Sequence, residues 1–279
     1  MYTQKSDWVN DHLATSNYYV SDHSSYSFRL GLPIEAKVSL RFFGNVRIGY
    51  IFLLAINAPR SIWKSCMNQS VKEHLIHLNK ITKHKIPLLI FSDDTPDEFG
   101  IVESNWTGRV ETGQGLRQFF AQFDNDFLSN VGDAKPINRS CNDSFQAWTI
   151  SNLSRYLTVN DVDAFELSSM EERLNVLELK RPKESCKTWL PYTDDAGNYK
   201  AGNWMSSNLH NTTFKTIAYN ADEKSTIVFL DISSIQANQL SGNLYRGSIE
   251  EVDLRKLNCM KTMEAFSSTR TTKTRRSHY

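Results

Sequence analysis

Cysteine is scarce in this sequence, and the few cysteines are scattered. Cys66, Cys141, Cys186 and Cys259 stand far apart among 279 residues, with no CxxC pair and no cysteine–histidine cluster at zinc-ligand spacing. We therefore expect neither a disulfide-stapled scaffold nor a structural zinc site. Free thiols indicate a reducing compartment, so the expected location is cytoplasmic.

Long apolar segments and phosphate-binding loops are also missing. The longest apolar run, residues 48–58, is interrupted by polar residues and has about half the length needed to cross a bilayer. The sequence does not start with a basic region followed by an apolar one, so no secretory leader is expected. Neither GxxxxGK[ST] nor GxGxxG occurs, which leaves no basis for nucleotide hydrolysis or dinucleotide binding.

An excess of charge of one sign is missing as well. The 32 lysines and arginines nearly balance the 31 acidic residues, for a formal net charge of +1. This balance argues against a basic protein that coats nucleic acid, so any polyanion would have to bind at a local cluster. The apolar fraction of 40% and the charged fraction of 23% are typical of a globular chain with a real core.

Periodicity predicts an α/β fold with a mixed central sheet flanked by helices. Alternating residues on either side of Gly44-Asn45 predict a hairpin, 36–43 with 46–56. Apolar residues at helical spacing predict a long helix over 60–83. His74 and His77 in this helix do not form an HExxH pattern, so we expect them to lie on a solvated face and not in a zinc site. The further predictions are helices over 115–128 and 144–156, and strands over 86–91, 164–167, 175–179, 214–219 and 226–232.

The residues that could carry chemistry lie on the expected strand pair 164–167 and 175–179. Asp163 directly precedes the first strand, whereas Glu178 and Lys180 are two apart on the second and therefore project from the same face. Two carboxylates and the backbone carbonyl of Leu179 could hold a hard divalent cation. A neighbouring lysine could orient water and offset charge on a phosphate. The alternative is a solvated hairpin whose Glu178 and Lys180 form a weak surface ion pair.

The pattern D-x14-ELK, formed by Asp163, Glu178 and Lys180, resembles the PD-(D/E)XK nuclease superfamily. The proline of that name is absent, because Val162 precedes the aspartate. The resemblance implies a restriction-endonuclease-like αβββαβ core, Mg²⁺ dependence with Mn²⁺ as a substitute, and cleavage of DNA. It makes Asp163 the first metal ligand, Glu178 the second and Lys180 the catalytic lysine. Asp161 is a second candidate for the aspartate, and Glu111 is a candidate for an additional acidic ligand.

The resemblance also implies a division of the chain. A nuclease domain over 110–260 would follow an N-terminal α+β module over 1–109, which supplies substrate recognition or dimer contacts in a homodimer. The basic segment 261–279 has no apolar pattern and is expected to be a disordered tail. The expected activity is that of a restriction-type or defence-type endonuclease that hydrolyses phosphodiester bonds in DNA.

Basic, amide and aromatic residues follow the ELK triplet and could contact nucleic acid. Cations could hold phosphates next to the cut, and aromatic rings could stack on bases. The candidates are Arg181, Lys183, Lys187, Asn198, Asn203 and Trp204.

Two other functions remain open from the sequence. Asp161 and Asp163 could form the DxD of a metal-dependent glycosyltransferase, but that function leaves Glu178 and Lys180 without roles. The chain could instead be a non-catalytic nucleic-acid-binding protein with a nuclease fold, although the intact Asp163, Glu178 and Lys180 argue against it.

Overall fold

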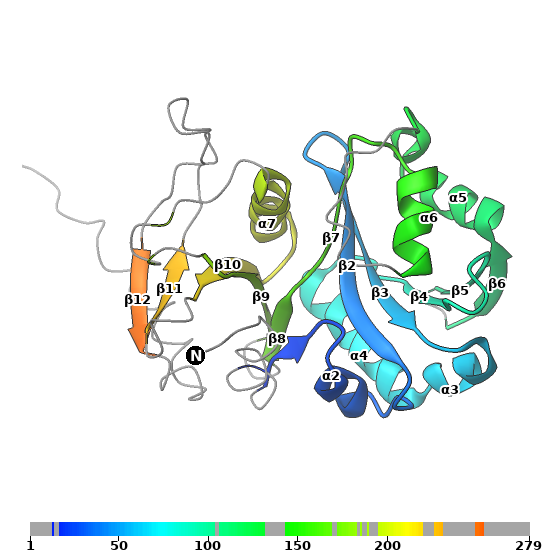
Figure 1. The fold of residues 1–279 in the computed structure, drawn as a ribbon, viewed down its shortest axis with the longest axis horizontal. Coiled ribbons are helices and arrows are strands. Elements are labelled where there is room, and N and C mark those ends of the chain that lie inside the picture. The colour runs from blue at the N-terminus through cyan, green and yellow to red at the C-terminus, as the bar shows by residue number, and fades with distance from the viewer. Residues whose placement is uncertain are drawn as a thin grey trace, which may run out of the picture.

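Two mixed β-sheets make up the centre of this α/β protein, and six α-helices accompany them in the described part of the chain (Figure 1). The computed structural model describes residues 13, 17–103, 106–131, 143–168, 172–182, 185, 189, 195–219, 226–230 and 249–253. One sheet, called sheet B, has the strand order β6-β5-β4-β3-β2-β7, and the other, sheet A, has the order β1-β8-β9-β10-β11-β12. The expected α/β class is confirmed.

Sheet B is built around the expected hairpin. β2 (Lys37–Asn45) pairs antiparallel with β3 (Gly49–Asn57), and the Asn45 side chain accepts hydrogen bonds from the backbone N–H groups of Arg47 and Ile48. The hairpin prediction is confirmed, with the turn displaced to residues 46–48. The remaining strands are β4 (Leu88–Phe91), β5 (Glu98–Val102), β6 (Gly108–Thr112) and β7 (Thr158–Asp161).

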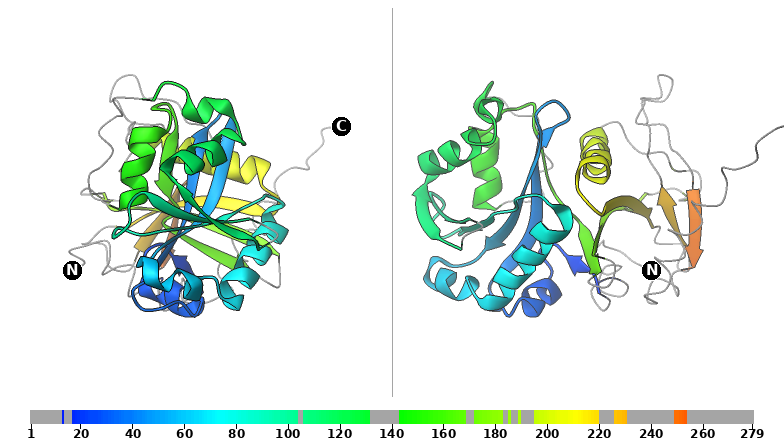
Figure 2. Two further views of the ribbon diagram at one scale, coloured as in Figure 1. Left: turned by 90° about the vertical axis from the view of Figure 1, so that its right-hand side faces the viewer. Right: turned by 180° about the vertical axis from the view of Figure 1, so that it is seen from behind.

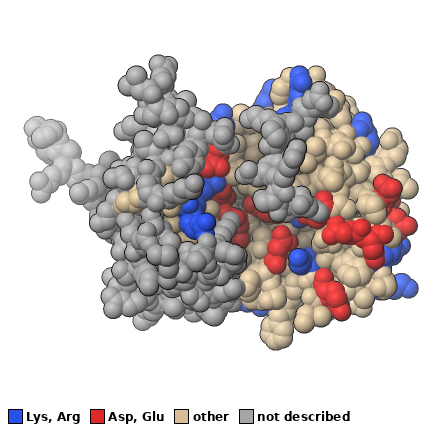
Figure 3. All heavy atoms as spheres, in the orientation of Figure 1, with Lys and Arg blue, Asp and Glu red and all other residues tan. Residues whose placement is uncertain are grey.

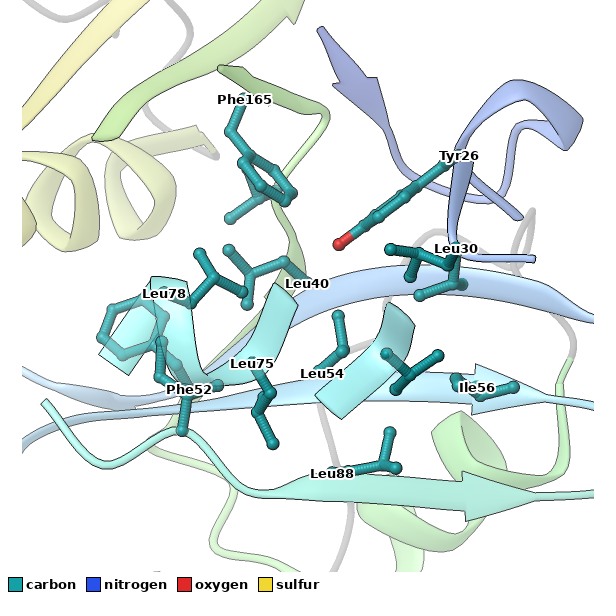
Figure 4. Close-up of a cluster of buried hydrophobic side chains, with 14 of the residues drawn as sticks. Tyr26, Leu30, Leu40, Phe52, Leu54, Ile56, Leu75, Leu78, Leu88 and Phe165 are labelled. Atoms are coloured by element: carbon teal, nitrogen blue, oxygen red, sulfur yellow. The ribbon is translucent and has the colours of Figure 1, made fainter. Parts of the chain in front are cut away.

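Both faces of sheet B are buried, because the apolar residues of β2 and β3 occupy both alternating sets of positions. Leu40, Phe42, Phe52 and Leu54 face one cluster, and Phe43 faces the other. The first cluster is covered by α2 (Ser24–Arg29), α3 (Trp63–Cys66) and α4 (Gln69–Thr82). Figure 4 shows its side chains, including Tyr26 of α2 and Phe165 of the other sheet. The second is covered by α5 (Gly113–Ala121), the 3₁₀ turn η2 (Asn125–Leu128) and α6 (Ser144–Asn152).

The long helix expected over 60–83 is broken in two. A 3₁₀ turn, η1 (Arg60–Ile62), leads into α3, and Asn68 then caps α4 by accepting a hydrogen bond from the Val71 N–H. The expected solvated position of His74 is wrong. His74 is 7% exposed, its Nε2 lies 2.9 Å from the Tyr26 hydroxyl oxygen, and burial lowers its pKa to about 3.

Sheet A contains the strands expected near the candidate site. β8 (Ala164–Ser168) and β9 (Arg173–Lys180) pair antiparallel, and β9 pairs parallel with β10 (Thr212–Ala218) after the crossover helix α7 (Ala196–Asn208). β10 pairs with β11 (Thr226–Leu230), β11 pairs with β12 (Ile249–Asp253), and β1 (Tyr19–Val20) pairs with β8 at the other edge. Figure 2 shows α7 on the side of sheet A that faces sheet B.

The described elements do not divide at residue 110. That position falls within β6, and α5, α6 and β7 follow it in sequence, yet all four complete sheet B and its core, whereas β1, near the start of the chain, completes sheet A. Hydrophobic pattern identifies elements, but it does not show which sheet each element joins. The expected tail, 261–279, lies outside the described residues.

The cysteines and the apolar character of the helices were also the subject of predictions from the sequence. Cys66 is a free, buried thiol, and burial raises its pKa to about 11; the other three cysteines lie outside the described part. None of the described helices combines the length and the apolar character that a membrane span requires.

Candidate active site

Asp163 lies in the short connection between β7 of sheet B and β8 of sheet A. The antiparallel register pairs Ala164 with Leu177. The residue before Ala164, which is Asp163, therefore lies next to the residue after Leu177, which is Glu178. The Asp163 carboxylate accepts a hydrogen bond of 2.7 Å from the backbone N–H of Leu179. The chain itself is fixed at this corner, because Ser21 N–H donates to the Asp163 carbonyl over 3.1 Å.

Glu178 and Lys180 form a close, shielded ion pair on β9. The Lys180 Nζ lies 2.9 Å from the Glu178 Oε1, and their side chains are 17% and 6% exposed. This burial argues against a solvated hairpin, because an exposed pair would keep both side chains in water. Although burial alone lowers the pKa of Lys180, the carboxylates of Glu178 and Asp195 raise it above its ordinary value. Lys180 is therefore a cation at neutral pH.

The first turns of α7 cover these two residues. Asp195, directly before the helix, places its Oδ1 2.9 Å from the Lys180 Nζ, and the Asn198 amide donates a 3.2 Å hydrogen bond to the Glu178 Oε1. The Tyr199 ring lies beneath the lysine, with its centroid 5.8 Å from Nζ. These three residues have the i, i+3 and i+4 spacing that brings side chains to one face of a helix. In Figure 3, basic and acidic side chains adjoin where β9, β10 and α7 lie in Figure 1.

Two hydroxyl groups near this cluster have no hydrogen-bond partner among the described residues. Tyr199 and Thr216 are both 0% exposed, and neither side-chain oxygen is bonded within the described part of the protein. Thr216 is the register partner of Glu178 across the parallel β9–β10 pair. Burial, followed by the charges of Asp195, Glu178 and Asp163, raises the pKa of Tyr199 above its ordinary value, so this hydroxyl stays protonated and can donate.

The alternative ligands Asp161 and Glu111 are held elsewhere. Asp161 pairs with Arg41 over 2.9 Å, and Arg41 also holds Asp143, the N-cap of α6, over 2.5 Å. Burial raises the pKa of Asp161 to about 6. Glu111 lies on β6, at the opposite edge of sheet B from β7, and pairs with Arg109 over 2.8 Å. The structure therefore does not bring Glu111 to Asp163, and it gives Asp161 a different partner.

The residues expected to contact nucleic acid are placed in different ways. Trp204 packs against the rings of Tyr50 and Phe52, roughly 13 Å along α7 from Asp195 at 1.5 Å per residue. The Trp204 ring already packs against other aromatic side chains, so the expected stacking of this ring on a base is not supported. Asn203 is half-buried on the same helix, and Arg181 directly follows β9. Lys183 and Lys187 lie outside the described residues.

The oxygen ligands at this site are of the type that a hard cation prefers, but the site has fewer of them than such a cation needs. Asp163 and Glu178 supply carboxylate oxygens, which Mg²⁺ prefers. Within the described ranges, no group of three or more His, Cys, Asp and Glu side chains is placed to hold a metal ion. Two carboxylates would thus need help from a carbonyl, for which Leu179 is the candidate, and from water.

Comparisons with known proteins add no assignment. No family model matches the chain, and no match was found among curated proteins or solved structures.

The sequence interpretation missed Asp195 and Thr216. A local signal existed for Asp195, because it stands four residues before Tyr199 at the start of a helix that follows the ELK triplet. Thr216 had no such signal, since its position next to Glu178 depends on the parallel register between β9 and β10.

Proposed function

We propose that this protein is a Mg²⁺-dependent phosphodiesterase that cleaves nucleic acid, with DNA as the expected substrate. The observation that carries the proposal is the convergence of Asp163, Glu178 and Lys180 at one end of the β8–β9 pair, against the start of α7. This juxtaposition of two acids and a buried cation is what the resemblance to PD-(D/E)XK nucleases requires. The restriction-endonuclease-like core and the homodimer remain parts of the proposal.

Each residue has a distinct role in the proposed reaction. Asp163 and Glu178 would hold Mg²⁺, or Mn²⁺ in its place, which supplies Lewis-acid activation of the phosphate and of a bound water. Lys180 offsets the negative charge that develops on the phosphate oxygens, and its burial strengthens that interaction. Asn198 fixes the orientation of Glu178 through their hydrogen bond, so its proposed role is positioning and not contact with DNA.

The substrate is expected to approach from the sheet A side. Arg181 follows the site directly and could meet a phosphate next to the cut. On the face shown in Figure 3, Asp and Glu side chains gather over the sheet B half, which would repel a phosphate backbone.

A glycosyltransferase function has less support. In a DxD site both aspartates hold one cation, whereas here Asp161 pairs with Arg41 and Asp163 accepts from the Leu179 N–H. The residue spacing is present, but the two carboxylates are directed to different partners.

A cleavage panel tests the proposal. Wild-type protein should cut at least one of plasmid, linear duplex, single-stranded DNA and RNA when Mg²⁺ or Mn²⁺ is added, and EDTA should stop the reaction. Lys180→Ala and Glu178→Gln should lower kcat by roughly 100-fold or more, because each removes a group that stabilises the transition state. Lys80→Ala, which removes an exposed lysine paired with Glu172, is the matched control and should cut normally.

Two results would contradict the proposal. One is equal cleavage by wild type and Lys180→Ala, which would assign the activity to another site or to a contaminant. The other is metal-independent binding of nucleic acid with no cleavage of any substrate, which would favour the non-catalytic alternative. Sedimentation velocity tests the homodimer separately.

A further inference from the structure

We infer that Asp195 is a positioning residue: its carboxylate holds the Lys180 ammonium in place when Glu178 binds the metal ion. This inference rests on the proposed function and adds a residue that the ELK triplet does not contain. Its basis is geometric: the Lys180 Nζ lies 2.9 Å from the Glu178 Oε1 and 2.9 Å from the Asp195 Oδ1.

Two carboxylates on one ammonium are more than a simple ion pair needs. Glu178 has a second expected use, because its oxygens are proposed metal ligands. When those oxygens turn to a divalent cation, Lys180 loses one of its two anionic partners and also meets a second positive charge. Asp195 then supplies the remaining attraction that keeps the ammonium from being displaced.

The local structure leaves Asp195 available for this role. It occupies the N-cap position of α7, yet its side chain makes no capping hydrogen bond. A negative charge at this end of a helix is favourable in any case. One turn later, the Tyr199 ring lies against the same ammonium, so the start of α7 confines Lys180 from two sides.

The flexibility of Lys180 gives a test that does not depend on activity. NMR relaxation of the side-chain ¹⁵Nζ, with the signal assigned by its loss in Lys180→Arg, reports how tightly the ammonium is held. In Asp195→Ala the order parameter of Lys180 should fall clearly, and the fall should be larger after Mg²⁺ is added. Asp195→Glu, which keeps the charge, should restore most of the order, and Asp97→Ala, which removes an exposed acid, should have no effect.

Kinetics separate positioning from metal binding. Asp195→Ala should lower kcat by roughly 10- to 100-fold, because a displacement of about 1 Å at a reacting group has an effect of that size. The KM for DNA and the Mg²⁺ concentration at half-maximal rate should stay within about twofold of wild type, since the change spares Asp163 and Glu178.

Several outcomes would overturn the inference. If Asp195→Ala leaves the order of Lys180 unchanged, the contact does not position the lysine. If saturating Mg²⁺ restores full kcat, Asp195 is a metal ligand. Should wild type cleave no substrate, the proposed function fails, and the relaxation measurement still decides whether Asp195 holds Lys180.

Discussion

Tyr199 shows how a single side chain can point to a ligand. Its hydroxyl is completely buried next to three carboxylate-bearing residues, and it has no partner within the described part of the chain. A buried polar group without a hydrogen bond costs about 1–3 kcal/mol. A buried group of this kind calls for an explanation, such as a catalytic role or a bound water or ion.

Tyr199→Phe tests this directly. We expect the free energy of unfolding to stay equal or to rise by up to about 1 kcal/mol, because the change removes a buried hydroxyl that has no partner among the described residues. Tyr26→Phe is the matched control. It removes an equally buried hydroxyl that is bonded to His74, and should lower stability by about 1 kcal/mol. Urea unfolding of both variants measures the difference, and equal losses would show that the Tyr199 hydroxyl is bonded after all.

His74 illustrates the limit of the sequence at this scale. The spacing of His74 and His77 does not match a zinc motif, and pattern alone placed both residues on a solvated face. The structure buries His74 because Tyr26, from a separate helix, supplies a hydroxyl partner that a local pattern cannot show.

At the scale of elements, α7 depends on a close approach to β10. A Cβ placed on Gly202 would lie only 2.3 Å from two ring atoms of Phe214. The absence of a side chain at residue 202 therefore sets the distance between the helix and the strand. The same helix carries Asp195 and Asn198, so this packing also sets the position of one wall of the site.

Gly202→Ala should destabilise the protein by about 1–3 kcal/mol, because overpacking at this contact exceeds the gain of about 1 kcal/mol in helix propensity. Gly202→Ala combined with Phe214→Leu should recover part of the loss. Ser207→Ala, at an exposed position of the same helix, should change stability by less than about 0.5 kcal/mol. Thermal unfolding distinguishes the three variants, and a stabilised Gly202→Ala would contradict the packing argument.

Most elements could be predicted from periodicity, and the exceptions have physical causes. The hairpin and the strands flanking the site follow from alternation, and α5 follows from helical spacing. The break at Met67 and Asn68 did not, because a helix-like apolar pattern continues through it. The Asn68 side chain creates the break by capping α4 and donating to the Leu30 and Gly31 carbonyls.

At the scale of the whole molecule, Arg41 joins segments that are far apart in the sequence. It is 4% exposed and pairs with Asp161 on β7 and with Asp143 at the start of α6. Asp161 ends the strand that leads into the Asp163 corner. The arginine therefore stabilises sheet B at the point where the chain leaves it for sheet A.

Arg41→Met should lower the free energy of unfolding by about 3–5 kcal/mol, because it leaves two shielded carboxylates without their cation. Arg47→Met breaks a pair with Asp126 in which the arginine side chain is 74% exposed, so it should cost no more than about 1 kcal/mol. Urea unfolding monitored by tryptophan fluorescence compares them. Similar losses in both variants would mean that the Arg41 cluster adds little to stability.

The sequence indicated Asp163, Glu178 and Lys180 of the candidate site. It did not indicate which segments of the chain belong to which of the two sheets. The pairing of β1 with β8, and of β7 with β2, joins residues more than 100 positions apart. Such contacts leave no periodic signal, which is why a boundary at residue 110 looked reasonable from the sequence and does not separate the sheets.

The crossing of the chain between the sheets has a practical consequence for anyone dissecting this protein. A fragment that begins after Asp161 loses β1, which pairs with the edge of β8. It also loses the ion pair between Arg41 and Asp161, which lies just before the connection that contains Asp163. A piece that ends there loses Asp163, Glu178 and Lys180 altogether. Minimised versions should therefore be made by shortening loops within the intact chain, and not by cutting it in two.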